Sequence, residues 1–412
     1  MSKNNFKPEI RFKNFTDAWE QRKLGEYTKY RRGSFPQPYG NKEWYGGENA
    51  MPFVQVVDVS NNLKLEPKTK QNISSIAQPK SVFVSSGTVV VTLQGSIGRV
   101  AITQYDSYVD RTLLIFEDYV RKTDKYFWGY TIQNKFNIEK EKAPGGTIKT
   151  ITKAALSQFV VSIPLYDEQS KIGIFLKNID NTITLHQHEL TLLKQRKKAF
   201  LQKMFPKKGK GLPQFRFSEF NTKWKNRNLG DVSPLRGGFA FKSDKFTTEG
   251  IPVVRITNIL SSGKVGGGFK YHERQVDDYK YILPNKSVLL AMSGATTGKV
   301  AILYKSPEEN YYQNQRVGYF SNLNIVDYDF ISTIVRTKDF MRQLEAVLVS
   351  GAQPNISSQE VNSFQFYFPV NRTEQQKIGK FFKQLDEDIE LHEQKLEKLK
   401  LMKRAFLQKM FV

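Results

Sequence analysis

The chain has no cysteine and only four histidines among its 412 residues. The absence of cysteine excludes disulfide bonds and thiolate metal sites, and it fits a reducing compartment. Four histidines are few for a histidine-based metal centre. We therefore assign no metal-binding residue in this chain.

Long apolar runs are also missing. No stretch approaches the roughly 20 residues that a membrane-spanning helix needs. The first ten residues, MSKNNFKPEI, lack the apolar core of a secretory signal, so we expect a cytoplasmic protein. An apolar fraction of 39% and an aromatic fraction of 13% are typical of folded domains, and the length allows two or more of them.

Negative charge is scarce beside positive charge, because 63 lysines and arginines face 40 acidic residues, a net charge of +23. Such an excess is typical of proteins that bind a polyanion, although some basic proteins are merely soluble. Residues 167–210 and 373–412 carry net charges of +6 and +2, which leaves +15 for the two long segments outside them. This distribution favours nucleic-acid contact through those segments.

The sequence contains a long internal repeat. Residues 168–205 align without a gap to residues 374–411, and both copies end in AFLQKMF. The segment PEIRFKNFTDAWEQRKLG at 8–25 returns as PQFRFSEFNTKWKNRNLG at 213–230. A weaker match joins GSIGRVAI, which begins at Gly95, to GATTGKVAI, which begins at Gly294. The chain is therefore a duplication, with a variable segment followed by a helix in each half.

Apolar residues recur in steps of four and three along both repeated helices, which is typical of a two-helix coiled coil. We assign the seam to Ile172, Leu176, Ile179, Ile183, His186, Leu190 and Leu193 in the first helix and to Ile378, Phe382, Leu385, Ile389, His392, Leu396 and Leu399 in the second. Each helix would span about 50 Å at 1.5 Å per residue. His186 and His392 share one seam position, where we expect a polar layer that fixes the register instead of a metal site.

These patterns predict an α+β fold with two mixed α/β domains joined by two long helices in an antiparallel coiled coil, related by a pseudo-two-fold internal repeat. The predicted parts are a first domain at 1–165, a first helix at 166–206, a linker at 207–212, a second domain at 213–370 and a second helix at 371–412. Within the domains, SVFVSSGTVVVTL, IPVVRITNI and FQFYFPV predict strands. DKYFWGYTIQN and DYDFISTIVRTKDFMRQLEAVL predict helices.

Catalytic motifs are absent. SGATTGKVAI resembles a phosphate-binding loop, but it is one residue short, and Val300 stands where a serine or threonine would bind magnesium. No nucleophile–histidine–acid set can be assembled, so we assign no catalytic residue and interpret the chain as a reader.

The loops of both variable segments hold side chains suited to phosphates and base edges, with Arg and Lys for guanine or phosphate and Asn and Gln for adenine. Candidate DNA contacts are Arg31, Arg32, Gln94, Arg99, Arg111, Lys149 and Thr150 in the first segment and Arg236, Arg255, Asn258, Thr296, Lys299, Asn314, Arg316, Gln353 and Asn355 in the second.

These residues and motifs resemble the specificity subunits of type I restriction–modification systems. IPLYDEQSKIGIFLKNID and FPVNRTEQQKIGKFFKQLD look like that family's proline, Glu-Gln and Lys-Ile motif at its helix entrances, and KKAFLQKMF looks like its helix exit. PEIRFKNFTDAWEQRKLG matches its segment opening, and GSIGRVAI, GATTGKVAI and GAQPNIS match its sparse recognition-domain motifs. One departure is that YDEQ and NRTEQ replace the commoner Pro-Pro before Glu-Gln.

The resemblance implies that two target recognition domains each read one half of a bipartite DNA sequence, with the helices as a spacer. It also implies that the helices dock two methyltransferase subunits, which methylate adenine N6, and that nuclease–translocase subunits join the full complex. S-adenosylmethionine, ATP and magnesium would then belong to those partners, and this chain would hold no cofactor. Because the two segments differ strongly, we expect two different half-sites and an asymmetric target.

Two alternatives remain open from the sequence. A stand-alone architectural DNA-binding protein would bind tightly as a soluble monomer without any enzyme partner. A nuclease with an unrecognised site would cut DNA by itself when magnesium is supplied.

Overall fold

The structure is a computed structural model, and it describes residues 7–142, 156–207, 209–276, 278–348 and 354–411. Its contacts divide the chain into two compact units. The first unit combines residues 1–188 with residues 394–412, and the second unit is residues 189–393. Each unit therefore contains part of both long helices, whereas the predicted boundaries followed the sequence repeat.

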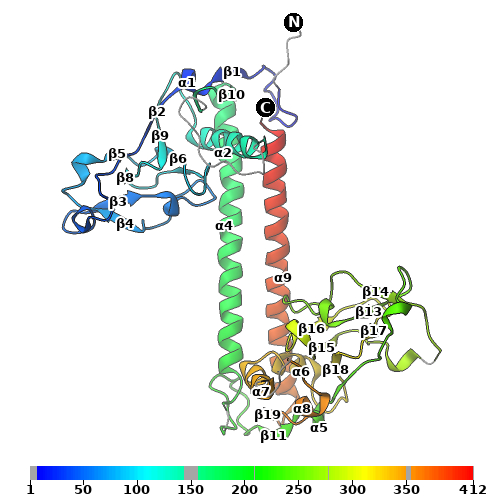
Figure 1. The fold of residues 1–412 in the computed structure, drawn as a ribbon. Coiled ribbons are helices and arrows are strands. Elements are labelled where there is room, and N and C mark those ends of the chain that lie inside the picture. The colour runs from blue at the N-terminus through cyan, green and yellow to red at the C-terminus, as the bar shows by residue number, and fades with distance from the viewer. Residues whose placement is uncertain (1–6, 143–155, 208, 277, 349–353, 412) are drawn as a thin grey trace. The chain divides into compact units, whose positions relative to one another are not determined.

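The first unit is mixed α/β (Figure 1). Its strands are β1 Glu20–Lys23, β2 Thr28–Arg32, β3 Met51–Val54, β4 Gln71–Ile73, β5 Val82–Val84, β6 Val89–Thr92, β7 Val100–Ile102, β8 Ser107–Val109, β9 Leu113–Tyr119 and β10 Val160–Ile163. Its helices are α1 Leu24–Tyr27, α2 Lys125–Lys142 and the 3₁₀ turns η1 Lys42–Trp44, η2 Val56–Asp58 and η3 Gln78–Lys80. They form sheets of order β2-β9-β6-β7 and β4-β3-β8-β5 and a β1-β10 pair.

The second unit repeats this plan. Its strands are β11 Lys225–Asn228, β12 Leu235–Arg236, β13 Ile251–Val254, β14 Lys270–His272, β15 Ser287–Ala291, β16 Val300–Leu303, β17 Tyr312–Gln313, β18 Val317–Phe320 and β19 Gln365–Phe368. Its helices are α5 Leu229–Val232, α6 Tyr328–Ile334, α7 Lys338–Leu348, α8 Ser358–Asn362 and the 3₁₀ turns η5 Ser243–Lys245, η6 Ile256–Asn258, η7 Asp278–Lys280 and η8 Gly294–Thr296. They form sheets of order β12-β18-β15-β16 and β14-β13-β17 and a β11-β19 pair.

The two units share an unusual strand pairing. β3 runs parallel to β8 in the first unit, and β13 runs parallel to β17 in the second, while all other strand pairs of the named sheets are antiparallel. A parallel pair needs a long connection between its strands. The duplication seen in the sequence is therefore a duplication of topology, as predicted.

The two long helices are α4 Tyr166–Lys203 and α9 Arg372–Lys409. Each begins with the same ionic contact, which we call the clasp. Glu168 accepts hydrogen bonds from Arg11 Nε at 2.6 Å and Nη2 at 2.8 Å, and Glu374 accepts the same pair from Arg216 at 2.7 and 2.8 Å. The indole of Trp224 adds a third bond to Glu374 at 3.1 Å. The clasp ties the repeated segment openings to the helix starts.

The glutamine of the Glu-Gln motif has its own task. Gln169 Nε2 donates to Pro164 O at 2.9 Å, and Gln375 Nε2 donates to Pro369 O at 2.7 Å. Both side chains are buried, and a buried amide needs such partners. The bonds fix the turn by which the chain leaves the preceding strand and enters the helix.

In the first unit, the start of α4 lies antiparallel to the end of α9. The rings of Phe175 and Phe406 meet edge-on at 4.9 Å, and Lys403 Nζ pairs with Asp180 at 2.7 Å. From the first contact to the second, the residue number rises from 175 to 180 on α4 and falls from 406 to 403 on α9, so the two helices run antiparallel here. Tyr130 of α2 also donates to Asp180 at 2.6 Å, so this buried carboxylate joins both helices to the domain.

In the second unit, the matching positions make the matching contacts. Phe200 meets Phe381 edge-on at 5.0 Å, and Lys197 pairs with Asp386. Arg336, two residues after the end of α6, takes the place of the tyrosine and pairs with Asp386 at 2.6 Å. The neighbouring cations outweigh burial and hold the pKa of the Asp386 carboxyl below its ordinary value.

All fourteen residues assigned to the seam are buried or half-buried, as a helix seam requires. Some apolar residues off the seam are exposed, including Ile174 at 53%, Leu185 at 55% and Leu391 at 47%. His186 belongs to the first unit, and His392, in the second, has its Nδ1 3.3 Å from Glu189 Oε2.

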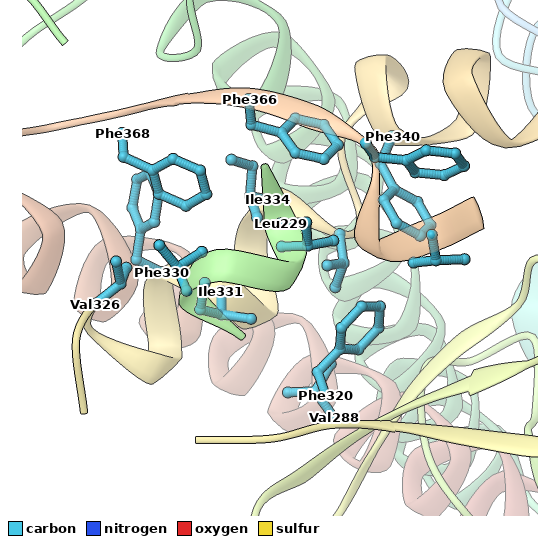
Figure 2. Packing of buried hydrophobic residues seen from close by; sticks show 14 of the residues in the cluster. Leu229, Val288, Phe320, Val326, Phe330, Ile331, Ile334, Phe340, Phe366 and Phe368 are labelled. Atoms are coloured by element: carbon cyan, nitrogen blue, oxygen red, sulfur yellow. The ribbon is translucent and has the colours of Figure 1, made fainter. Parts of the chain in front are cut away.

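A cluster of buried aromatic residues holds the second unit together, and Figure 2 shows four of its members, Phe330 of α6, Phe340 of α7 and Phe366 and Phe368 of β19. The rings of Phe340 and Phe366 stack at 6.2 Å with an interplanar angle of 21°. Phe330 is fully buried, and truncating such a side chain to alanine costs about 3–5 kcal/mol. Among the described helices, none is long and apolar enough to cross a membrane.

Candidate nucleic-acid interface

Three loops meet at one edge of the sheets in the first unit. They are residues 55–58 after β3, residues 93–99 between β6 and β7, and residues 110–112 between β8 and β9. Asp110 N donates to Val54 O at 3.0 Å, and Leu93 N donates to Thr112 O at 2.8 Å. These backbone bonds join the three loops into one continuous edge, which we call the first loop edge.

A cavity of about 410 Å³ opens on the first loop edge. Its lining includes Tyr39, Gln55, Val57, Lys70, Arg111 and Thr112. Val57 is 57% exposed. The cavity thus combines several types of side chain that proteins use on DNA. Cations and hydroxyls contact phosphates, amides contact base edges, and exposed methyl groups contact the thymine methyl.

A buried carboxylate supports this cavity. Asp110 is 2% exposed and accepts hydrogen bonds from the Tyr39 hydroxyl and from Thr112 N, the latter at 2.9 Å. Burial and the adjacent Asp110 carboxylate raise the pKa of Tyr39, so the phenol stays protonated and donates. The guanidinium of Arg111 lies 4.8 Å from the Tyr39 ring centre. Arg111 is thus held over a neutral aromatic face while remaining exposed to solvent.

The second unit has an equivalent second loop edge. It consists of residues 255–258 after β13, residues 292–299 between β15 and β16, and residues 314–316 between β17 and β18. Asn314 N donates to Val254 O at 3.1 Å, and Met292 N donates to Arg316 O at 3.0 Å. These bonds repeat the two that join the loops of the first unit.

A fourth segment of chain reinforces the second loop edge. Gly294 N donates to Pro354 O at 3.1 Å, and Arg316 Nη1 donates to Asn355 Oδ1 at 3.4 Å. Thr296 Oγ1 donates to Ile256 O at 3.4 Å. Arginine, asparagine and threonine side chains therefore gather on one surface.

Most of the predicted DNA contacts lie on the two loop edges. These are Gln94, Arg99 and Arg111 in the first unit and Arg255, Thr296, Lys299, Asn314, Arg316 and Asn355 in the second. Lys149, Thr150 and Gln353 lie outside the described residues.

Three predicted contacts lie on strands. Arg31 and Arg32 are exposed on β2, and Arg31 pairs with Glu117 of β9. Arg236 is exposed on β12, with its guanidinium 4.9 Å from the Tyr319 ring centre. Their positive charge lies on the sheet surface beside the loops.

Asn258 requires a different assignment. It is 1% exposed, its Oδ1 accepts from Arg255 N at 3.0 Å, and its Nδ2 donates to Gly266 O at 3.0 Å and Gly268 O at 3.2 Å. The side-chain amide is thus fully engaged inside the protein. We therefore assign Asn258 to holding the loop and no longer to contacting DNA.

Sequence reasoning missed Tyr39, Gln55, Val57 and Lys70. Gln55 and Val57 sit inside the apolar run MPFVQVVDV, which gives no sign of where the strand ends. An alignment of that run with IPVVRITNI in the second half places Gln55 opposite Arg255, which is a candidate contact by residue type.

Neither unit, within its described residues, gathers three or more His, Asp or Glu side chains into a possible metal site of its own. The loop that resembled a phosphate-binding motif is a turn between antiparallel strands β15 and β16. It lacks the strand-to-helix context in which such loops hold phosphate.

Comparison with known proteins identifies the family. The family model described as "Type I restriction modification DNA specificity domain" matches residues 16–195 and 221–401. A crystal structure of the type I restriction–modification system S subunit from M. genitalium is similar at a TM-score of 0.67 and 15% identity, covering 98% of this chain and 99% of that one. A second structure, titled for complex assembly and conformational transition of the type I R-M system, is similar at a TM-score of 0.51 and 14% identity, covering 95% and 97%. The chain therefore belongs to the family of type I restriction–modification DNA specificity proteins.

Proposed function

We propose that this chain is the DNA-reading, non-catalytic subunit of a type I restriction–modification complex. Each unit reads one half of a bipartite and asymmetric target through its loop edge, and the two long helices set the separation of the half-sites. The chain docks two methyltransferase subunits and, in the full complex, nuclease–translocase subunits. S-adenosylmethionine, ATP and magnesium are held by those partners.

One observation carries the reading role: the same loop scaffold occurs twice and presents different polar side chains each time. The first loop edge presents Gln94 and Arg111, and the second presents Arg255, Arg316 and Asn355. Equal scaffolds with unequal side chains are suited to two unlike half-sites. The net charge of +23 supplies the sequence-independent attraction to phosphate.

Docking of two identical partners is supported by exposed apolar side chains at equivalent positions. Leu165 and Val370, which follow the prolines at the two helix entrances, are 62% and 52% exposed. Leu185 and Leu391, at the same place in the two helices, are 55% and 47% exposed. Exposed apolar residues that recur at the same place in both copies are suited to two copies of one partner.

A methylation map tests the proposal. Cells express this chain with a type I methyltransferase subunit, and modified bases are mapped across their DNA. We expect N6-methyladenine at a two-part motif that disappears when this chain is omitted. No new methylation, with the methyltransferase active beside another specificity chain, would contradict the proposal. Specific binding of one DNA target by this chain alone, unaltered by the enzyme, would indicate a stand-alone binder.

A further inference from the structure

We infer that residues 55 and 255 are equivalent base-reading positions, and that Gln55 reads an adenine in one half-site while Arg255 reads a guanine in the other. This inference rests on the proposed function and assigns to each unit a base and a residue that reads it. It starts from the loops that follow β3 and β13, which we call the reading loops.

The two reading loops have the same backbone. Residues 51–60 and 251–260 show the same sequence of strand, 3₁₀ turn and bridge, and the same order of buried, half-buried and exposed side chains. Glu66 N donates to Asp58 O at 2.8 Å, and Gly266 N donates to Asn258 O at 3.0 Å. The donors and acceptors of these two bonds differ by 200 in residue number, so the scaffold positions correspond one to one.

Both loops are held from inside by a buried side chain at the same position. Asp58 accepts from Gln55 N at 2.8 Å and from Lys70 N at 2.7 Å, and Asn258 accepts from Arg255 N at 3.0 Å. Each is at most 2% exposed. The backbone that carries residue 55 or 255 is therefore fixed before any ligand arrives, which lowers the entropy lost on binding.

A lysine shortly after each loop contacts a long helix within the same unit. Lys64 Nζ donates to Asn181 Oδ1 of α4 at 3.1 Å, and Lys264 Nζ pairs with Glu390 of α9. The two lysines again differ by 200 in number. The lysine keeps its residue type in both units.

Position 55/255 does not keep its residue type. Both half-sites present the same phosphates, so a position that contacts only phosphate has no need to differ between the units. The first unit instead has a neutral glutamine and the second an arginine. Glutamine makes two hydrogen bonds to adenine N7 and N6, and arginine makes two to guanine N7 and O6.

The surroundings support both assignments. Gln55 lines the cavity of the first loop edge together with Val57, whose exposed methyl groups suit a thymine methyl. In the described part of the chain, no ion pair involves Arg255, and its buried Nε has no hydrogen-bond partner. Its guanidinium lies 6.0 Å from the Phe246 ring centre, in a cation–π contact. A partly buried cation without a carboxylate partner calls for an external acceptor.

The test is a reciprocal exchange in the full chain, Gln55→Arg and Arg255→Gln, each with the methyltransferase subunit. The target motif of each variant is read from a methylation map and from selection of random duplex DNA. We expect Arg255→Gln to change one G·C pair towards A·T in one half-site and Gln55→Arg to make the opposite change in the other. Each variant should lose roughly tenfold or more in preference for the original base. The untouched half-site reports that the variant is folded.

Arg342→Gln is the matched control, because it removes one exposed positive charge from the second unit away from the loop edge. It should leave both half-sites unchanged. If both exchanges keep the original motif, the inference is wrong and the proposed function stands. The inference is also wrong if Arg255→Gln weakens binding to all sequences equally and lowers the salt slope by about one, since that is the signature of a phosphate contact. If the unaltered chain directs no sequence-specific methylation or binding, the proposed function itself fails.

Discussion

The clasp between Glu374 and Arg216 gives a quantitative prediction for the second unit. Glu374 is 1% exposed and accepts from two atoms of Arg216 and from Trp224. Glu374→Gln keeps the shape but leaves the arginine charge unpaired in a buried site. Breaking a buried pair in this way costs about 3–5 kcal/mol. For a unit of about this size, each kcal/mol lowers Tm by roughly 2–4 °C, so we expect a fall of roughly 6–20 °C.

The assay must resolve the two units, because a chain with two units does not unfold in one step. Calorimetry follows the transition of the second unit, and hydrogen exchange measures opening at the first turn of α9. The double variant Glu374→Gln with Arg216→Met should recover much of the loss, since no buried charge is then stranded.

Glu393→Gln is the control, since Glu393 and its partner Lys194 are 47% and 54% exposed. An exposed pair contributes about 0–1 kcal/mol, so this variant should unfold close to the unaltered chain. The argument that the clasp stabilises the unit would be refuted by a Glu374→Gln variant that unfolds at the original temperature. Hydrogen exchange gives a second way to refute the argument. It is refuted if Glu374→Gln and Glu393→Gln lose the same protection from exchange at the first turn of α9.

Three further predictions concern single contacts. Asp386→Asn leaves Lys197 and Arg336 without their carboxylate and should lower the free energy of unfolding by about 1.5–3 kcal/mol. Lys197→Met keeps Asp386 paired with Arg336 and should cost far less in denaturant unfolding. The pKa of Asp386 is lowered in the folded protein, so its charge adds to the free energy of unfolding above about pH 4, and this addition is lost as the pH falls further. The free energy of unfolding of Asp386→Asn should therefore fall less in acid than that of the unaltered chain. Gly33→Ala places a Cβ 2.2 Å from the carbonyl oxygen of Val109. The resulting overpacking should lower the free energy of unfolding of the first unit by about 1–3 kcal/mol, which is measured as a lower melting temperature.

The repeat, the α+β class and the long helices could be predicted from the sequence, because their signals are periodic and local. α4 and α9 begin at residues 166 and 372, and the predicted helices began at 166 and 371. The helical candidates in the domains became α2, α6 and α7. An apolar pattern repeated every seven residues leaves few other ways to bury the same side chains.

The loop edges could be predicted only in outline. Residue type marked Asn258 as a contact, but the fold encloses its amide between the carbonyls of Gly266 and Gly268. The sequence does not mark Gln55 as a contact, because it follows two buried strand residues without a turn signal. Which side chain faces outward depends on hydrogen bonds between loops far apart in sequence, and those bonds leave no local pattern.

The duplication separates what the fold needs from what a ligand needs. Not every scaffold position keeps its residue type, since Asp58 in the first unit corresponds to Asn258 in the second. The clasps at Glu168 and Glu374 do use the same acid and arginine, and Lys64 and Lys264 are the same cation. Packing and buried charge leave little choice at such positions. Where other residues already fix the backbone of a loop, folding does not determine the type of a side chain that projects from it. The backbone around Gln55 and Arg255 is the same and calls for neither residue type, whereas the inferred adenine and guanine contacts would call for this difference.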